Sequence, residues 1–119
     1  MSMEEVKPFE VNRPWGNFRQ FTLNTPSTVK IITVNPNEKL SLQSHKKRAE
    51  FWHIISGSGT VEIDDMSFEA TEGKEYTINI GAKHRMVAGP YGVAMLEIAI
   101  GEFLEEIDEV RFEDKYGRA

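Results

Sequence analysis

Short segments of alternating apolar and polar residues follow one another along the chain, and almost none has the spacing of an amphipathic helix. Between these segments lie clusters of Pro, Gly, Asn and Asp, which are typical of turns. The strands that this pattern predicts lie at residues 18–23, 29–34, 51–55, 60–63, 66–70, 74–78, 85–88 and 93–100. Eight short strands at this spacing predict an all-β fold, a small antiparallel jelly-roll barrel.

The two ends of the chain are expected to lie outside this barrel. We predict one domain, residues 1–119, with an N-terminal arm at 1–16, the barrel at 17–101 and a C-terminal tail at 102–119. Trp15 and Phe18 are expected to anchor the arm. In the tail, the acidic segment 102–109 is compatible with a helical turn or an extended arm, and residues 110–114 alternate enough to add an edge strand.

Composition narrows the class of protein. A length of 119 residues suits one domain with its own core. Nineteen acidic against fourteen basic residues, without a long basic stripe, argue against a nucleic-acid partner. The chain has no cysteine, which excludes disulfides and thiolate ligands. No apolar run approaches the roughly 20 residues of a membrane span, and the N-terminus lacks the apolar core of a signal peptide, so we expect a cytoplasmic protein without a membrane partner.

Four polar residues in the middle of the chain are candidate metal ligands: Gln43, His45, Glu50 and His84. Gln43 and His45 are two residues apart, so in an extended segment their side chains point to the same face. The loop at 46–49 lets the chain reverse and return Glu50 beside His45. Any one of these residues alone is more often an ordinary hydrogen-bonded polar residue, and the hypothesis rests on their combined spacing.

Strand parity also predicts what surrounds Glu50. Trp52 and Ile54 share its face, and His53 points away. Two neutral imidazoles, a carboxylate and an amide oxygen suit one divalent ion per chain. The set suits zinc, iron, cobalt, nickel or manganese, and the ligands alone do not choose among these ions; zinc is our first expectation. One or two coordination positions remain for substrate or water, as a catalytic site requires.

The glycines beyond these residues complete a known pattern. The stretch 43–57 resembles the first motif of the cupin superfamily, and the stretch 73–84 resembles the second, with Asn79 in place of its usual proline and Gly81 retained. A narrower resemblance, to the phosphomannose isomerase cupin, covers nearly the whole chain. This cupin is found at the C-terminus of bifunctional mannose-1-phosphate guanylyltransferase/mannose-6-phosphate isomerases. The strings that carry this resemblance are RPWG at 13–16, SLQSH at 41–45, RAEFW at 48–52, GEFL at 101–104 and VRFED at 110–114.

The resemblance implies a metal-dependent isomerase that interconverts mannose 6-phosphate and fructose 6-phosphate through a cis-enediol. It also implies a phosphosugar substrate and, by analogy with small cupins that pair through their terminal strands, a homodimer. Two other classes stay open: a non-catalytic cupin that binds a sugar as a sensor or accessory subunit, and a metal-dependent oxygenase. The Gln-x-His motif and the tail motif favour the isomerase.

Two cations are candidate catalytic residues. Arg48 lies two residues before Glu50, where its fork of donors can bind a phosphate or an enediolate; the alternative is a salt bridge to an acidic neighbour. Lys30 interrupts the apolar run 29–32. It either points into the cavity, to contact phosphate or act as an acid or base, or lies on an exposed face.

Overall fold

A computed structural model describes residues 6–101 and 109–113, and the strands in these residues confirm the predicted all-β antiparallel fold. No helix in the described part of the chain is long and apolar enough to cross a membrane, and the expected cytoplasmic location stays a prediction. The strands are β1 (Phe9–Arg13), β2 (Gly16–Gln20), β3 (Ser27–Val34), β4 (Leu42–His45), β5 (Arg48–Ile63), β6 (Met66–Thr71), β7 (Glu75–Ile78), β8 (His84–Gly101) and β9 (Glu109–Glu113).

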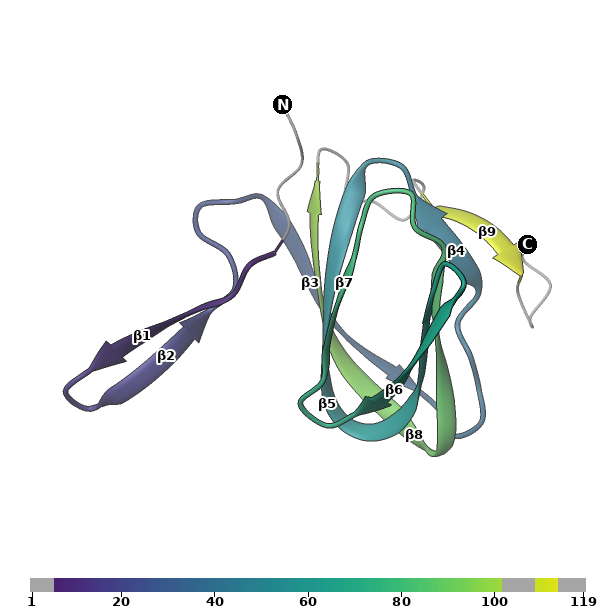
Figure 1. Ribbon diagram of the computed structural model, residues 1–119, viewed down its shortest axis with the longest axis horizontal. Helices are drawn as coiled ribbons and strands as arrows, with labels where there is room; N and C mark the ends of the chain where they lie inside the picture. Colours follow the sequence, from purple (N-terminus) through teal and green to yellow (C-terminus); the bar gives the residue numbers. More distant parts are fainter. Residues whose placement is uncertain (1–5, 102–108, 114–119) are drawn as a thin grey trace.

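Two long strands organise the main sheet. β5 and β8 run antiparallel along nearly their whole lengths, from Arg48 opposite Gly101 to Ile63 opposite His84. β6 and β7 pair with β5, β3 and β4 pair with β8, and β9 pairs with β4 (Figure 1). The seven strands fold around a common interior, but the hydrogen-bonded order of the described strands runs from β6 to β9 without closing on itself. The predicted jelly-roll is therefore present as an open barrel.

A pair of irregularities bends β5 where it crosses β8. The register shifts between Ile54 and Ser56 and again between Gly57 and Gly59. Gly57 has φ 78°, and a Cβ there would lie 2.2 Å from the carbonyl oxygen of Gly92. Only glycine fits this close approach, because any side chain would strike the backbone of the facing strand.

The interior of the open barrel is a cluster of apolar side chains from both long strands. Its largest fully buried members are Trp52, Ile54, Ile78, Met86 and Met95. Glu50, Trp52 and Ile54 are all buried on this inner face, which confirms the predicted parity of β5. The cluster provides a packed base for the polar residues at the start of β5 and β8.

A second apolar cluster covers the other side of the main sheet. Phe51, Ile98 and Ile100 pack there against Val6 and the partly buried Phe21. These last two residues flank the first two strands, so the N-terminal segment covers part of the sheet.

The hairpin β1–β2 pairs only with itself among the described strands and projects from the barrel (Figure 1). It spans the predicted boundary between residues 16 and 17, so the division into arm, barrel and tail stays a prediction. Trp15 is 73% exposed and Phe18 is 37% exposed, so the prediction that they anchor the arm is wrong. At the other end, β9 is the edge strand expected near 110–114. The alternatives for 102–109 fall almost wholly outside the described residues.

Candidate metal centre

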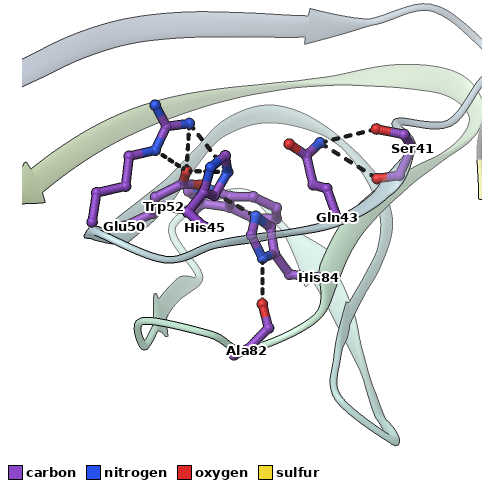
Figure 2. A network of polar contacts seen from close by, with 8 residues as sticks. Ser41, Gln43, His45, Glu50, Trp52, Ala82 and His84 are labelled. Carbon is purple, nitrogen blue, oxygen red and sulfur yellow. Dashed lines mark hydrogen bonds and ion pairs between the residues drawn. The ribbon is translucent and has the colours of Figure 1, made fainter. Parts of the chain in front are cut away.

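Three predicted ligands converge at one end of the open barrel. His45 ends β4, Glu50 lies near the start of β5 and His84 begins β8. Their ligand atoms all lie within 4.8 Å of one another, and all three side chains are buried (Figure 2). Residues far apart in the sequence meet here because Gln43 on β4 lies directly opposite His84 on β8.

The ring of His84 is oriented by the backbone. Its Nδ1–H donates to the carbonyl oxygen of Ala82 at 2.9 Å, which leaves the lone pair of Nε2 directed toward Glu50, 3.6 Å from Oε1. Burial lowers the pKa of His84, so the imidazole is held in its neutral form. A neutral imidazole whose other nitrogen donates to a carbonyl is the usual state of a metal ligand.

Both carboxylate oxygens of Glu50 face donors. The indole Nε1–H of Trp52 donates to Oε1 at 3.1 Å, and Nε2 of His45 lies 3.0 Å from Oε2. Burial alone would raise the pKa of Glu50, but hydrogen bonds with His45 and Glu97 outweigh it and hold that pKa below its ordinary value. The buried carboxylate is therefore ionised, the form in which a carboxylate binds a cation.

His45 supplies the observation that tests whether these residues fit a metal. Its Nδ1 is buried and has no hydrogen-bond partner among the described residues. Leaving a buried nitrogen unpaired costs about 1–3 kcal/mol. Two imidazoles and one carboxylate within reach of a single point are a donor set that divalent ions accept. The residues therefore fit a divalent metal ion.

Gln43, the fourth predicted ligand, lies beside this group. Its amide Nε2 is 3.3 Å from Oγ and 3.4 Å from the carbonyl oxygen of Ser41. Figure 2 shows the amide nitrogen turned to Ser41 and the amide oxygen on the side of His45 and Glu50. The structure thus places an amide oxygen next to the three-residue cluster.

A cavity of about 370 Å³ opens next to the cluster, within the range of small-molecule sites. Glu50 and His84 line it together with six further polar side chains: Lys30, Ser41, Gln43, Arg48, Glu97 and Arg111. Three of these are cations, from β3, β5 and β9. A ligand that carries negative charge suits such a lining.

Lys30 lines this cavity and is partly buried, so it does not lie on an exposed outer face. Its register explains why. Lys30 lies opposite Glu97, and Glu97 lies opposite Trp52. Directly paired residues of an antiparallel sheet point to the same side, so the side chains of Lys30 and Glu97 both face inward with Trp52.

Arg48 forms the salt bridge that was the alternative to its predicted role, and its partner is Glu50 itself. Its Nε donates to Glu50 Oε2 at 3.0 Å and its Nη2 lies 2.9 Å from the same oxygen. The same Nη2 is 3.2 Å from Nε2 of His45. The guanidinium therefore contacts two predicted metal ligands. Arg48 is only 3% exposed and also lines the cavity.

Glu97 and Arg111 are cavity residues that the predicted site did not include. Burial, then the charge of Glu50 and a hydrogen bond with it, raise the pKa of Glu97 to about 8, so this carboxyl is largely protonated at neutral pH. The signal for Glu97 was available, because it is the one charged residue of the apolar run 93–100, just as Lys30 is in 29–34. Arg111 faces the cavity because β9 pairs it with Gln43.

An open β-barrel with two histidines and a glutamate at one end defines a cupin with a candidate metal centre. Among solved structures, a cupin protein from Bacteroides fragilis superposes with a TM-score of 0.60 at 22% identity, covering 86% of this chain and 82% of the other. The family model described as "Mannose-6-phosphate isomerase C-terminal" matches residues 2–114. The chain belongs to this family.

The chain spans about a quarter of the curated relatives it matches. It is 41% identical to the alginate biosynthesis protein AlgA of Pseudomonas aeruginosa, over 92% of this chain and 23% of that protein. It is 40% identical to the mannose-1-phosphate guanylyltransferase ManC of Salmonella typhimurium, again over 92% of this chain and 23% of the relative.

These comparisons correct the predicted function. We expected the chain to interconvert mannose 6-phosphate and fructose 6-phosphate. Its relatives are named for alginate biosynthesis and for mannose-1-phosphate guanylyltransferase, and the chain matches only a part of each. The prediction that this chain is by itself a mannose-6-phosphate isomerase is therefore wrong. The family name describes the domain and does not establish a reaction for it.

Proposed function

We propose that this chain is the metal-dependent, sugar-phosphate-binding domain of an enzyme of mannose-phosphate metabolism. The observation that carries the proposal is the combination of three buried ligand side chains with a polar cavity that also presents three cations. The relatives support the substrate class, because one of them is named for mannose 1-phosphate.

In this proposal Gln43, His45, Glu50 and His84 hold one divalent ion, with zinc first among the ions that these ligands accept. An ion bound there would polarise a sugar oxygen and stabilise negative charge that develops on it. Cationic side chains of the protein would bind the phosphate group. Lys30 and Arg48 line the cavity beside these ligands, within reach of a bound sugar phosphate.

The charge of the cavity lining supports a phosphorylated ligand over a neutral sugar. The polar lining brings together Lys30, Arg48 and Arg111 from three different strands. Guanidinium and ammonium groups bind phosphate oxygens through charge-assisted hydrogen bonds, which are about twice as strong as neutral ones. A neutral sugar would make hydroxyl contacts alone and would gain none of these charge-assisted bonds.

The experiment is calorimetric titration of the protein with mannose 6-phosphate, mannose 1-phosphate and mannose, before and after loading with Zn²⁺. We expect a sugar phosphate to bind only the loaded protein, and at least about tenfold more tightly than mannose, the equivalent of one charge-assisted hydrogen bond. Binding that is independent of the metal, or equal for mannose, would contradict the proposal.

A matched pair of histidine variants identifies the metal site. His84→Ala removes a proposed ligand and should weaken Zn²⁺ binding about 100-fold or more, with loss of sugar-phosphate binding. His53→Ala removes an imidazole that points away from the cavity and donates to Glu75, and should leave both affinities unchanged. Equal metal affinity in the two variants would exclude His84 as a ligand.

We also propose that the chain forms a homodimer through its N-terminal hairpin. The register of β1 with β2 places Phe9, Val11 and Phe18 on one face and Arg19 on the other. Arg19 is bonded to Glu75 of the barrel, so the apolar face points away from the chain's own body. An isolated two-stranded hairpin is marginally stable in water, and a second copy supplies the missing cover.

A further inference from the structure

Arg48 contacts side-chain atoms of Glu50 and His45, two of the residues that would bind a metal ion. We propose that Arg48 and the divalent cation compete for Glu50 and His45, and that the guanidinium released by the metal binds the anionic group of the ligand in the cavity. The inference rests on the proposed function, since it concerns the metal and the anion of that site. In this inference, Arg48 couples the binding of the metal to the binding of the anion.

The competition follows from shared lone pairs. Two N–H groups of Arg48 reach one oxygen of Glu50, at 2.9 and 3.0 Å, and one of them lies 3.2 Å from Nε2 of His45. A metal ion binds carboxylate oxygens at about 2.0–2.2 Å, through the lone pairs of Glu50 that now face the guanidinium, and Arg48 also fills the space beside Nε2 of His45. Two cations a few ångströms apart at a buried site also repel strongly.

The released guanidinium has a defined destination. Arg48 already lines the cavity, and its residue is only 3% exposed, so a charge that leaves Glu50 stays buried. A buried cation is stabilised by a counter-charge. The phosphate of a ligand in the cavity supplies that charge, and its tetrahedral oxygens match the planar fork of arginine.

Metal and anion therefore favour the same arrangement of Arg48. Binding of either one lowers the cost of binding the other, and the coupling must be equal in both directions. If Arg48 only orients Glu50 for the metal, its removal would weaken metal binding instead. The two roles predict effects of opposite sign, which makes them separable.

The test uses Co²⁺ as the metal and inorganic sulfate as the anion, since cobalt phosphate is sparingly soluble. Calorimetry gives the Co²⁺ affinity of the full chain, of Arg48→Met and of the control Arg85→Met. Arg85 is also paired with a glutamate, Glu62, but does not line the cavity. We expect Arg48→Met to bind Co²⁺ about tenfold more tightly than the wild type, and Arg85→Met to match the wild type.

The coupling is measured by repeating these titrations with sulfate. Sulfate should tighten Co²⁺ binding to the wild type by about fivefold or more, and should have no such effect on Arg48→Met. Weaker Co²⁺ binding by Arg48→Met, or coupling that persists in it, would overturn the inference. A wild type that binds no metal contradicts the proposed function, whereas metal binding without coupling contradicts only the inference.

A second measurement uses the wild-type protein, so its result does not depend on whether a variant folds. In the metal-free wild type, the Nε–H of Arg48 donates to Glu50 and should exchange slowly with solvent in an NMR experiment. Adding Zn²⁺ should accelerate this exchange, and adding sulfate afterwards should slow it again. An Arg48 signal that stays protected throughout would show that the guanidinium never leaves Glu50. Arg48→Lys, which keeps the charge without the fork, should show reduced coupling.

Discussion

At the scale of single residues, close backbone packing at Gly57 accompanies the bend of the strand that carries Glu50. Gly57 lies beyond Glu50 on β5, at the point where the strand bends against β8. Along the β5–β8 ladder Glu50 lies opposite Ala99 and His84 lies opposite Ile63, so the two predicted ligands meet only because the long strands bend between these points. The glycine belongs to the motif recognised in the sequence, and the structure supplies the physical reason for it.

Gly57→Ala is expected to destabilise the fold, because the new Cβ would lie 2.2 Å from a carbonyl oxygen and φ is 78°. We expect a loss of at least about 2 kcal/mol in the free energy of unfolding, measured with urea. Gly73→Ala is the matched control. Gly73 has φ 88° but no atom within 4 Å of the added Cβ, so it should lose only about 1 kcal/mol. Equal losses would show that the close approach adds nothing.

At the scale of elements, the hairpin β1–β2 is attached to the barrel by a charged contact. Arg19 of β2 donates to both oxygens of Glu75 on β7, at 2.6 Å to Oε1, and His53 of β5 donates to Glu75 Oε2 at 2.6 Å. The hydrogen bond from Arg19 holds the pKa of Glu75 below its ordinary value, against the effect of partial burial. One carboxylate thus joins three strands.

This contact predicts how the hairpin responds to acid. Because the pKa of Glu75 is lower in the folded state, its contribution to stability is complete above the unfolded value of 4.5 and is lost as the pH falls through the folded pKa. We expect the amide chemical shifts of residues 9–20 to change over this range, with a parallel decrease in unfolding free energy. In Glu75→Gln, both should change less with pH over this range, although the other acidic residues still titrate. The same pH dependence in both proteins would assign the effect to other groups.

At the scale of the whole molecule, two exposed apolar surfaces lie on the same chain. One is the hairpin face with Phe9 and Phe18, and the other is the outer face of the edge strand β3, where Ile31 is 68% exposed and Val29 is 58% exposed. Exposed apolar faces of this kind mark interaction sites. The proposed dimer buries the hairpin of one copy on β3 of the other, in both directions.

Single substitutions on either surface should therefore weaken the dimer. Phe18→Ser and Ile31→Ser are each expected to raise the dimer dissociation constant at least about tenfold, as sedimentation equilibrium would measure it. Asn17→Ser changes the polar face of the same hairpin and should have no effect. A wild type that sediments as a monomer at every concentration would contradict the proposed dimer.

The sequence predicted those features that depend on local pattern. Period-two alternation predicted the all-β fold and the parity of Glu50, Trp52 and Ile54, because successive side chains of a strand must point to opposite faces. The same reasoning missed two long strands, β5 and β8, which were predicted as shorter pieces divided by turns. The bulges at Ser56 and Gly57 look like turn signals in the sequence but only bend the strand.

The sequence by itself determined the fold class, the family and the four candidate metal ligands, because motif spacing and strand parity are properties of neighbouring residues. Only the tertiary structure decided what surrounds those ligands. Strand pairing brings Lys30, Glu97 and Arg111 into one cavity beside those ligands. Register between distant strands is set by the packing of the whole sheet, so it cannot be derived from the local pattern of any one segment.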